Sequence, residues 1–199
     1  MAAEYVLDIQ TIVSRQISPQ EPAVVTVGSI HGGTKRNIIP DEVKLQLSIR
    51  AYSDAVRERI LDSLQKMALG VGTANGLPVD RMPIVTVSKT EAAPVTYNDP
   101  AVAARLKPIF VAALGAGNVA DWHSDMGSED FGLFGLPGRK IPAFFLRLGA
   151  ADPAKLSESQ RTGVSVPGLH SALFAPVPSS TIRAGVIAMT AAVIELMKK

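Results

Sequence analysis

Residues 43–52 alternate strictly between apolar and polar side chains, and this pattern constrains the fold more than any other feature. The apolar members are Val43, Leu45, Leu47 and Ile49, and the polar members are Lys44, Gln46, Ser48 and Arg50. Such alternation is typical of a half-buried antiparallel strand with one face on the core and one in water. We therefore expect an antiparallel sheet whose Arg50 points away from the core.

The preceding segments predict what this strand packs against. Residues 4–16 carry apolar side chains at helical spacing, which indicates an amphipathic helix. Residues 23–30 are rich in β-branched side chains and predict a second strand, which the Gly32-Gly33 pair ends. A helix and two strands thus come before residue 53.

A second helix and a further strand are expected downstream. Ser53 can cap a helix with an apolar stripe, and Gly70 or Gly72 would end it. Residues 82–88 predict one more strand. The order α-β-β-α-β over roughly residues 4–90 resembles a βαββαβ sandwich that lacks its first strand.

The pattern changes after a proline-bounded linker at residues 91–100. We expect a helix from Pro100 to about Leu114, a short strand at 143–148, and a last helix capped by Ser179 or Ser180. The predicted division is therefore residues 1–93 and 94–199. The predicted fold class is α/β of the α+β type, with a two-layer sandwich and an antiparallel sheet first.

Composition excludes several classes of function. The chain has 199 residues, 47% of them hydrophobic, and a net charge of +2 without a basic run, so nucleic acid is not an expected partner. The sequence contains no run of 18 apolar residues and no signal-peptide pattern at its start, so we expect no membrane partner and a cytoplasmic location. The absence of cysteine excludes disulfides.

A first candidate motif surrounds the Gly32-Gly33 pair. Glycines there let the main chain approach a ligand closely, and Asn37 with Arg50 supplies an amide donor and a guanidinium fork that suit a carboxylate. If Asn37 precedes the strand of Arg50, both can face the same open side. The plainer interpretation is a Gly-Gly hairpin, a turn asparagine and a solvated arginine, and without further support it is favoured.

Possible metal ligands cluster in the second half. They are Asp121, His123, Asp125, Glu129 and Asp130. Charged residues in such a loop are more often a solvated turn than a metal site, and a catalytic zinc needs three or more protein ligands. His170, in a Pro-Gly-Leu-His-Ser loop, is the better ligand candidate, although a lone loop histidine is commonly only a surface residue.

Taken in order, three motifs resemble a known family. They are Gly32-Gly33-Thr34-x-x-Asn37-x-Ile39-Pro40-Asp41 with Arg50, then Gly127-Ser128-Glu129-Asp130-Phe131, then Leu169-His170-Ser171. The chain resembles the metal-dependent aminoacylase and carboxypeptidase family, and within it the hippurate hydrolases and the amidohydrolases that cleave N-acyl amino acids such as indole-acetyl conjugates.

This resemblance implies a two-part organisation. Residues 1–93 would be most of a lid domain that also forms a homodimer, and residues 94–199 would be the C-terminal part of a catalytic metallohydrolase domain. Asn37 and Arg50 match the positions that hold the substrate carboxylate, often in the partner subunit's site. His170 matches the last metal ligand. The family's N-terminal half, with its other ligands and its general base, has no counterpart in the sequence, and Glu129 does not correspond to that base.

The implied chemistry is metal-assisted amide hydrolysis. Zinc or manganese would activate a water molecule, a carboxylate would take its proton, and positive groups would stabilise the oxyanion. No catalytic residue is assigned in this sequence, and the chain by itself is expected to bind no metal stably and to be inactive. The alternative is a non-catalytic dimerisation or binding module derived from the same family.

Overall fold

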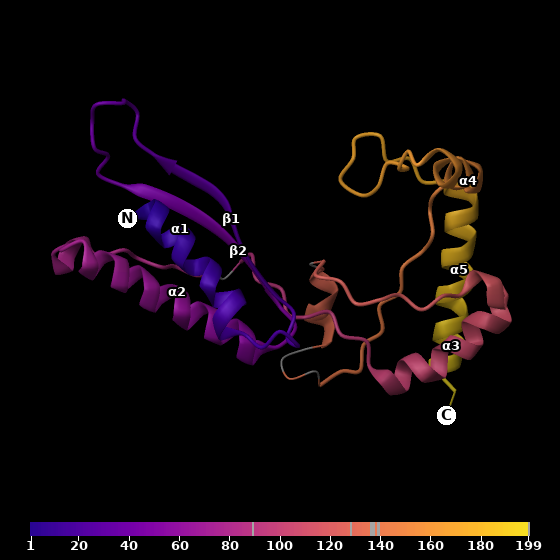
Figure 1. The fold of residues 1–199 in the computed structure, drawn as a ribbon. Helices are drawn as coiled ribbons and strands as arrows, with labels where there is room; N and C mark the ends of the chain where they lie inside the picture. The colour runs from indigo at the N-terminus through magenta and orange to yellow at the C-terminus, as the bar shows by residue number, and fades with distance from the viewer. Residues whose placement is uncertain (89, 128, 136–137, 139, 199) are drawn as a thin grey trace. The chain divides into compact units, whose positions relative to one another are not determined.

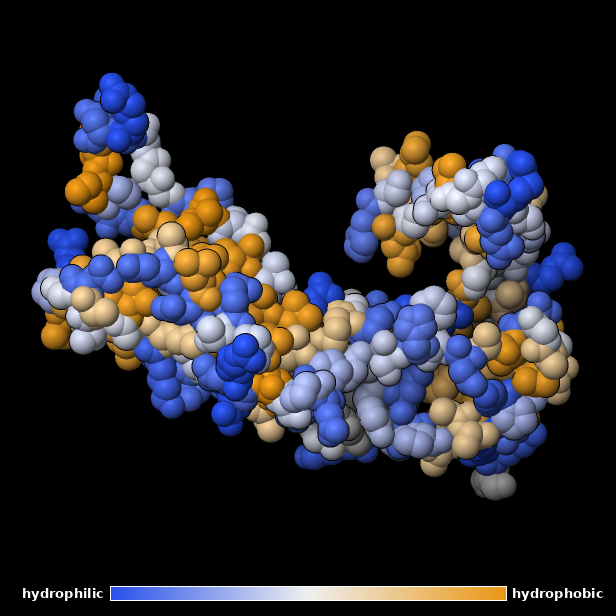
Figure 2. Space-filling view, in the orientation of Figure 1, coloured by the Kyte–Doolittle hydropathy of each residue, from blue (hydrophilic) through white to orange (hydrophobic). Residues whose placement is uncertain are grey.

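The structure, a computed structural model, describes residues 1–88, 90–127, 129–135, 138 and 140–198. They form two compact units, the first of residues 1–96 with 124–133 and the second of residues 97–123 with 134–199 (Figure 1). Apolar residues are visible at the surface of both units (Figure 2). The combination of helices with an antiparallel sheet confirms the predicted α+β class.

The two units are not continuous stretches of the chain. Sequence patterns predicted a division at residues 93/94, whereas the structure adds the later segment 124–133 to the first unit. The identification of the two regions as a lid and part of a catalytic domain stays a prediction.

The first unit is a helical layer on a two-stranded sheet. Helix α1 (Ala2–Thr11) continues through one π-helical turn, η1 (Ile12–Gln16). Strands β1 (Ala23–Gly32) and β2 (Val43–Ala51) pair antiparallel, with Ala23 opposite Ala51 and Gly32 opposite Val43. The register shifts once, between Val27 and Ser29. These elements confirm the helix and both strands predicted for this region.

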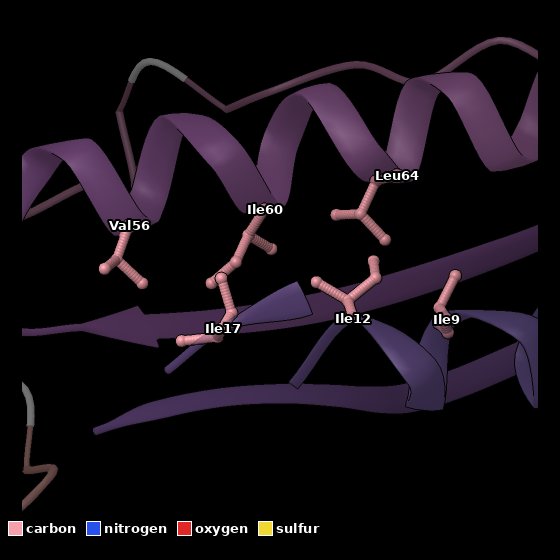
Figure 3. Packing of buried hydrophobic residues seen from close by; sticks show 6 residues of the cluster. All are labelled: Ile9, Ile12, Ile17, Val56, Ile60 and Leu64. Atoms are coloured by element: carbon pink, nitrogen blue, oxygen red, sulfur yellow. The ribbon is translucent and has the colours of Figure 1, made fainter. Parts of the chain in front are cut away.

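The core of this unit lies between the helices and one face of the hairpin (Figure 3). Its buried members are Ile9, Ile12, Ile17, Val56, Ile60 and Leu64. The apolar sides of both strands pack against them, including Val25, Leu47 and Ile49. Fully burying one such aliphatic side chain contributes about 1.5–3 kcal/mol, so this interface holds the hairpin against the helices.

Helix α2 (Asp54–Ala74) runs further than the sequence predicted. Ser53 caps it as expected, since its hydroxyl accepts a hydrogen bond from the Val56 amide at 3.2 Å. The helix then passes both Gly70 and Gly72. A glycine inside a helix costs only about 1 kcal/mol, and at Gly72 the absent side chain leaves room for Met82 and Pro83.

The expected strand at residues 82–88 is wrong. These residues, all of them described, follow the short 3₁₀ turn η2 (Val79–Arg81) without joining the β1–β2 sheet. Pro83 has no N–H to donate to a ladder. In a βαββαβ sandwich the last strand also pairs with the first, and this sequence has no counterpart of the first.

Two long helices organise the second unit. Helix α3 (Pro100–Leu114) and helix α5 (Pro178–Leu196) pack through Leu106, Phe110 and Ala188, and Ala192 completes their buried cluster. The carboxylate of Asp99 caps α3. The start of α5 corrects the expected serine cap, because Pro178 occupies its first turn and Val177 is the N-cap.

The strand expected at residues 143–148 is also wrong, because no ladder forms along these described residues. The Asn98 carboxamide satisfies the main chain of Phe145 instead. It donates to the Phe145 carbonyl at 2.8 Å and accepts from the Phe145 amide at 2.6 Å. A side chain therefore occupies the place of a neighbouring strand.

The remaining helices among the described residues are short. They are η3 (Ala116–Asn118), η4 (Asp130–Gly135) and α4 (Pro153–Thr162). Sequence analysis missed α4, although Asp152 caps it and Gly163, with a φ of 74°, ends it.

Helix α5 exposes most of its apolar stripe. Ile182, Val186, Met189 and Val193 are 50–65% exposed, while Ala188 and Ala192 face α3. By length and composition alone α5 could cross a membrane, with a mean hydropathy of 1.3 over 18 residues. Arg183 and Glu195 lie within the helix, and its packing on α3 is that of a globular unit.

Candidate substrate and metal-binding residues

Asn37 lies in the loop that joins β1 to β2. The loop begins at Gly33, whose φ of 75° favours glycine, and turns through a hydrogen bond from the Ile38 amide to the Lys35 carbonyl at 3.3 Å. Asn37 is exposed within that turn. Its carboxamide is therefore presented at the tip of the hairpin.

Arg50 lies at the opposite end of the hairpin. It is exposed, as the alternation predicted, and stands opposite Val24, seven positions beyond Val43 where the loop joins β2. At 3.3 Å per residue, that distance along the strand is about 23 Å. The structure therefore does not bring Asn37 and Arg50 of one chain together around a small ligand. Their roles as substrate-binding residues stay predictions.

Arg50 does contact the residue that directly precedes the second motif. Its Nη1 donates a hydrogen bond to the Met126 carbonyl, and the Tyr52 hydroxyl donates to the neighbouring Asp125 carbonyl at 2.8 Å. Two motifs 76 residues apart are thus joined inside the first unit. Sequence reasoning missed Tyr52, although its position two residues after Arg50 places it on the same side of an extended chain.

The acidic residues near this contact serve local hydrogen bonds. Asp125 Oδ1 accepts from the Gly127 amide at 2.8 Å, and Glu129 Oε1 accepts from the Asp130 amide at 3.0 Å. Ser128, the second residue of the second motif, lies outside the described residues. These bonds shape the segment as a turn, which agrees with the plainer interpretation of its charges.

The other two members of the predicted cluster belong to the second unit. Asp121 forms an ion pair with Lys107 at 2.7 Å, and the ring of His123 stacks on Trp122 with centroids 5.0 Å apart. The guanidinium of Arg147 lies over the Trp122 ring, 5.4 Å from its centroid. Asp121 and His123 are thus occupied by local partners.

His170 lies in an exposed turn before α5. Its φ of 68° makes it the only non-glycine residue in the left-handed region among the residues that the structure describes. The Ser171 amide donates to the Gly168 carbonyl at 3.2 Å and closes the turn around it. Histidine is enriched in this region of backbone space relative to most residues, so the turn presents the imidazole without a severe steric penalty.

Across the described parts of the chain, no three His, Asp or Glu side chains converge as metal ligands do. A catalytic zinc ion requires about three protein ligands with an open position. The residues at hand therefore do not fit a complete metal centre, and His170 could supply one ligand of several.

Comparisons with known proteins find similar sequences and one similar structure. Residues 1–70 match the peptidase dimerisation domain of the M20 type. The hippurate hydrolase of Campylobacter jejuni is 31% identical over 134 residues, which cover 67% of this chain and 33% of that protein. The N-acetyldiaminopimelate deacetylase of Leuconostoc citreum is 32% identical over 162 residues, covering 81% of this chain and 40% of that protein.

Two further comparisons extend this likeness. Thermostable carboxypeptidase 2 of Saccharolobus solfataricus is 29% identical over 147 residues, covering 74% of this chain and 35% of that protein. The crystal structure of a proposed aminohydrolase from methicillin-resistant Staphylococcus aureus has the same fold, with a TM-score of 0.71 at 23% identity. The structural match covers 100% of this chain and 46% of the Staphylococcus aureus chain. The chain thus spans less than half the length of each of these proteins.

Proposed function

Because the chain belongs to the M20 family of peptidases and amidohydrolases, we propose that the full protein carrying it hydrolyses the amide bond of N-acyl amino acids. Two of the relatives support this substrate class, since hippurate and N-acetyldiaminopimelate are both N-acyl amino acids with a free carboxylate. The family is generally dependent on divalent metal ions, and we propose zinc or manganese for this protein.

The observation that carries the proposal is the position of Arg50. Its guanidinium lies at the end of β2 and contacts the segment that bears the second motif. Only Nη1 takes part in that described bond, and a guanidinium has five N–H donors, so the Nε and Nη2 edge can take a carboxylate with two parallel bonds. Arg50 would hold the amino-acid end of the substrate.

Asn37 would act at a different place from the Arg50 of its own chain. Asn37 lies in the loop beyond one end of β2, and Arg50 lies about 23 Å along that strand from its first residue, Val43. In a homodimer formed through the first unit, the exposed loop tip can extend to the partner subunit, where its carboxamide would meet the carboxylate of a second substrate. This assignment rests on the family resemblance and on the exposure of Asn37.

His170 would be one metal ligand in the full protein, and the remaining ligands would come from residues outside this sequence. We propose accordingly that the 199-residue chain by itself has no amidase activity. A second candidate function is a non-catalytic dimerisation or binding module, and the match of residues 1–70 to a dimerisation domain favours it.

Kinetics of the full natural protein that contains these residues would decide between the two functions. With zinc or manganese, hydrolysis of N-benzoylglycine above the buffer rate would support the enzyme, and no turnover with either metal would favour the module. Arg50→Lys keeps the charge but loses the fork, so kcat/KM for carboxylate substrates should fall about tenfold to a hundredfold.

The matched control is the same substrate with its carboxylate converted to an amide. Arg50→Lys should change its kcat/KM far less, because the lost fork has no carboxylate to bind. Asn37→Ala should weaken carboxylate substrates by about fivefold, since a neutral donor is worth less than a charged one. Equal effects of Arg50→Lys on both substrate types would remove Arg50 from substrate binding.

A further inference from the structure

The segment 124–133 is attached to the first unit at both of its ends. At the first end, Arg50 and Tyr52 donate hydrogen bonds to two consecutive carbonyls, those of Met126 and Asp125. Arg50 is the next-to-last residue of β2, and Tyr52 directly follows the strand. Two donors on one strand end thus fix two successive peptide units.

The second end is fixed by close packing on residues 94–96. The Thr96 hydroxyl donates to the Glu129 carbonyl at 3.4 Å. A Cβ atom added at Gly132 would lie 2.5 Å from the Pro94 carbonyl oxygen and 3.0 Å from that of Val95. Both neighbours are main-chain atoms, which cannot rotate away as a side chain can. Glycine is therefore needed for this approach of the two backbones.

The part of the segment between the anchors has its own local bonds. The carboxylate of Asp125 accepts from the Gly127 amide, and that of Glu129 accepts from the Asp130 amide. Such short-range bonds set the shape of a turn but do not attach it to anything else. The contacts at the two anchors attach the segment to the rest of the unit.

We propose that Arg50 and Tyr52 form a latch that holds the segment 124–133 in place, with Tyr52 as a positioning residue that touches no substrate. The tyrosine bond is neutral and exposed, and the arginine bond carries a charge. Loss of either donor should make the segment detach more readily. The helices and the hairpin should stay folded, because their core does not include these bonds. The Gly132 packing is a second, independent anchor.

Proteolysis of the 199-residue chain by a Glu-specific endoproteinase tests the latch without any activity assay. Cleavage after Glu129 requires local release of the segment, whereas cleavage after Glu42, in the β1–β2 loop, does not. Tyr52→Phe removes one hydroxyl and should raise the Glu129 rate about fivefold, with the Glu42 rate unchanged.

Arg50 offers a rescue within the same experiment. Arg50→Met should raise the rate of cleavage after Glu129 about tenfold, because a charged donor is lost. Arg50→Lys should keep much of the protection, because its ammonium group can still donate to the Met126 carbonyl. Gly132→Ala should also raise the Glu129 rate. Its matched control is Gly149→Ala, since no atom lies within 4 Å of a Cβ added at Gly149.

The latch would be overturned if Tyr52→Phe left the Glu129 rate unchanged, or if both cleavage rates rose together, as a loss of global stability would cause.

A kinetic expectation for the full enzyme rests on the proposed function. In the full enzyme Tyr52→Phe should lower kcat/KM equally for carboxylate and amide substrates, whereas Arg50→Lys should discriminate between them. A failure of hydrolysis would leave the proteolysis result standing, so the two proposals fail separately.

Discussion

Glu195 links the two helices of the second unit through charged hydrogen bonds. Lys198 Nζ lies 2.6 Å from its carboxylate, and Arg105 Nε on α3 lies 3.1 Å from it. These bonds, first from Lys198 and then from Arg105, hold the pKa of the Glu195 carboxyl below its ordinary value of 4.5. The Glu195 side chain is 15% exposed, but Arg105 and Lys198 are 43% and 61% exposed, so water screens both bonds.

The stability of the second unit should therefore depend on pH. A lowered folded-state pKa means that this stabilisation is fully present above the ordinary glutamate pKa and is lost as pH falls through the folded-state pKa. We expect Glu195→Gln to lower the urea midpoint at pH 7 and to reduce the further drop seen on acidification toward pH 3. Parallel pH profiles for both proteins would contradict this role.

At the scale of single residues, sequence predicted chemistry better than contacts. The alternation in β2 predicted correctly that Arg50 points away from the core. Its bond to the Met126 carbonyl, 76 residues away, could not be predicted. Every residue has a main-chain carbonyl, so the sequence does not show which one accepts the bond. The same holds for Asn98, whose carboxamide bonds to the main chain of Phe145.

At the scale of elements, helical periodicity was a reliable guide where an apolar face is buried. The amphipathic helices predicted at residues 4–16 and after Ser53 both form, and their buried faces include Ile9, Ile60 and Leu64. The strands expected at 82–88 and 143–148 are wrong, because a strand needs a neighbour and periodicity within a segment says nothing about that neighbour. Glycine likewise stopped no helix at Gly70 or Gly72.

These two glycines of α2 offer a matched pair. A Cβ at exposed Gly70 meets no atom within 4 Å, so Gly70→Ala should stabilise the chain by about 0.5–1 kcal/mol through helix propensity. At Gly72 the Cβ would lie 2.7 Å from both Met82 Sδ and Pro83 Cδ. Gly72→Ala should therefore destabilise by about 1–3 kcal/mol. Urea unfolding of both variants measures the difference, and equal shifts would contradict the packing of residues 82–83 on α2.

At the scale of the whole molecule, the described chain leaves much apolar surface uncovered in each unit. In the first, a hollow of about 310 Å³ lies between β1 and the helical segment formed by α1 and η1, lined in part by Val13 of η1 and Val24 of β1. In the second, the α5 stripe is at least half exposed at Ile182, Val186 and Met189. Apolar side chains exposed along one helix face or around a hollow are candidate contact surfaces for other protein.

We therefore expect the purified chain to self-associate at tens of micromolar, since a two-stranded sheet and the α5 stripe both present groups that seek partners. Val186→Glu combined with Met189→Lys places opposite charges on the stripe without changing net charge, and should reduce the α5 contribution to association. Val79→Glu is the control, because Val79 is 91% exposed in η2 and lies outside both surfaces. Sedimentation velocity measures the species present. A strictly monomeric wild-type chain would show that these surfaces need no partner, and association that the double variant leaves intact would assign it to the first unit, where the dimerisation-domain match lies.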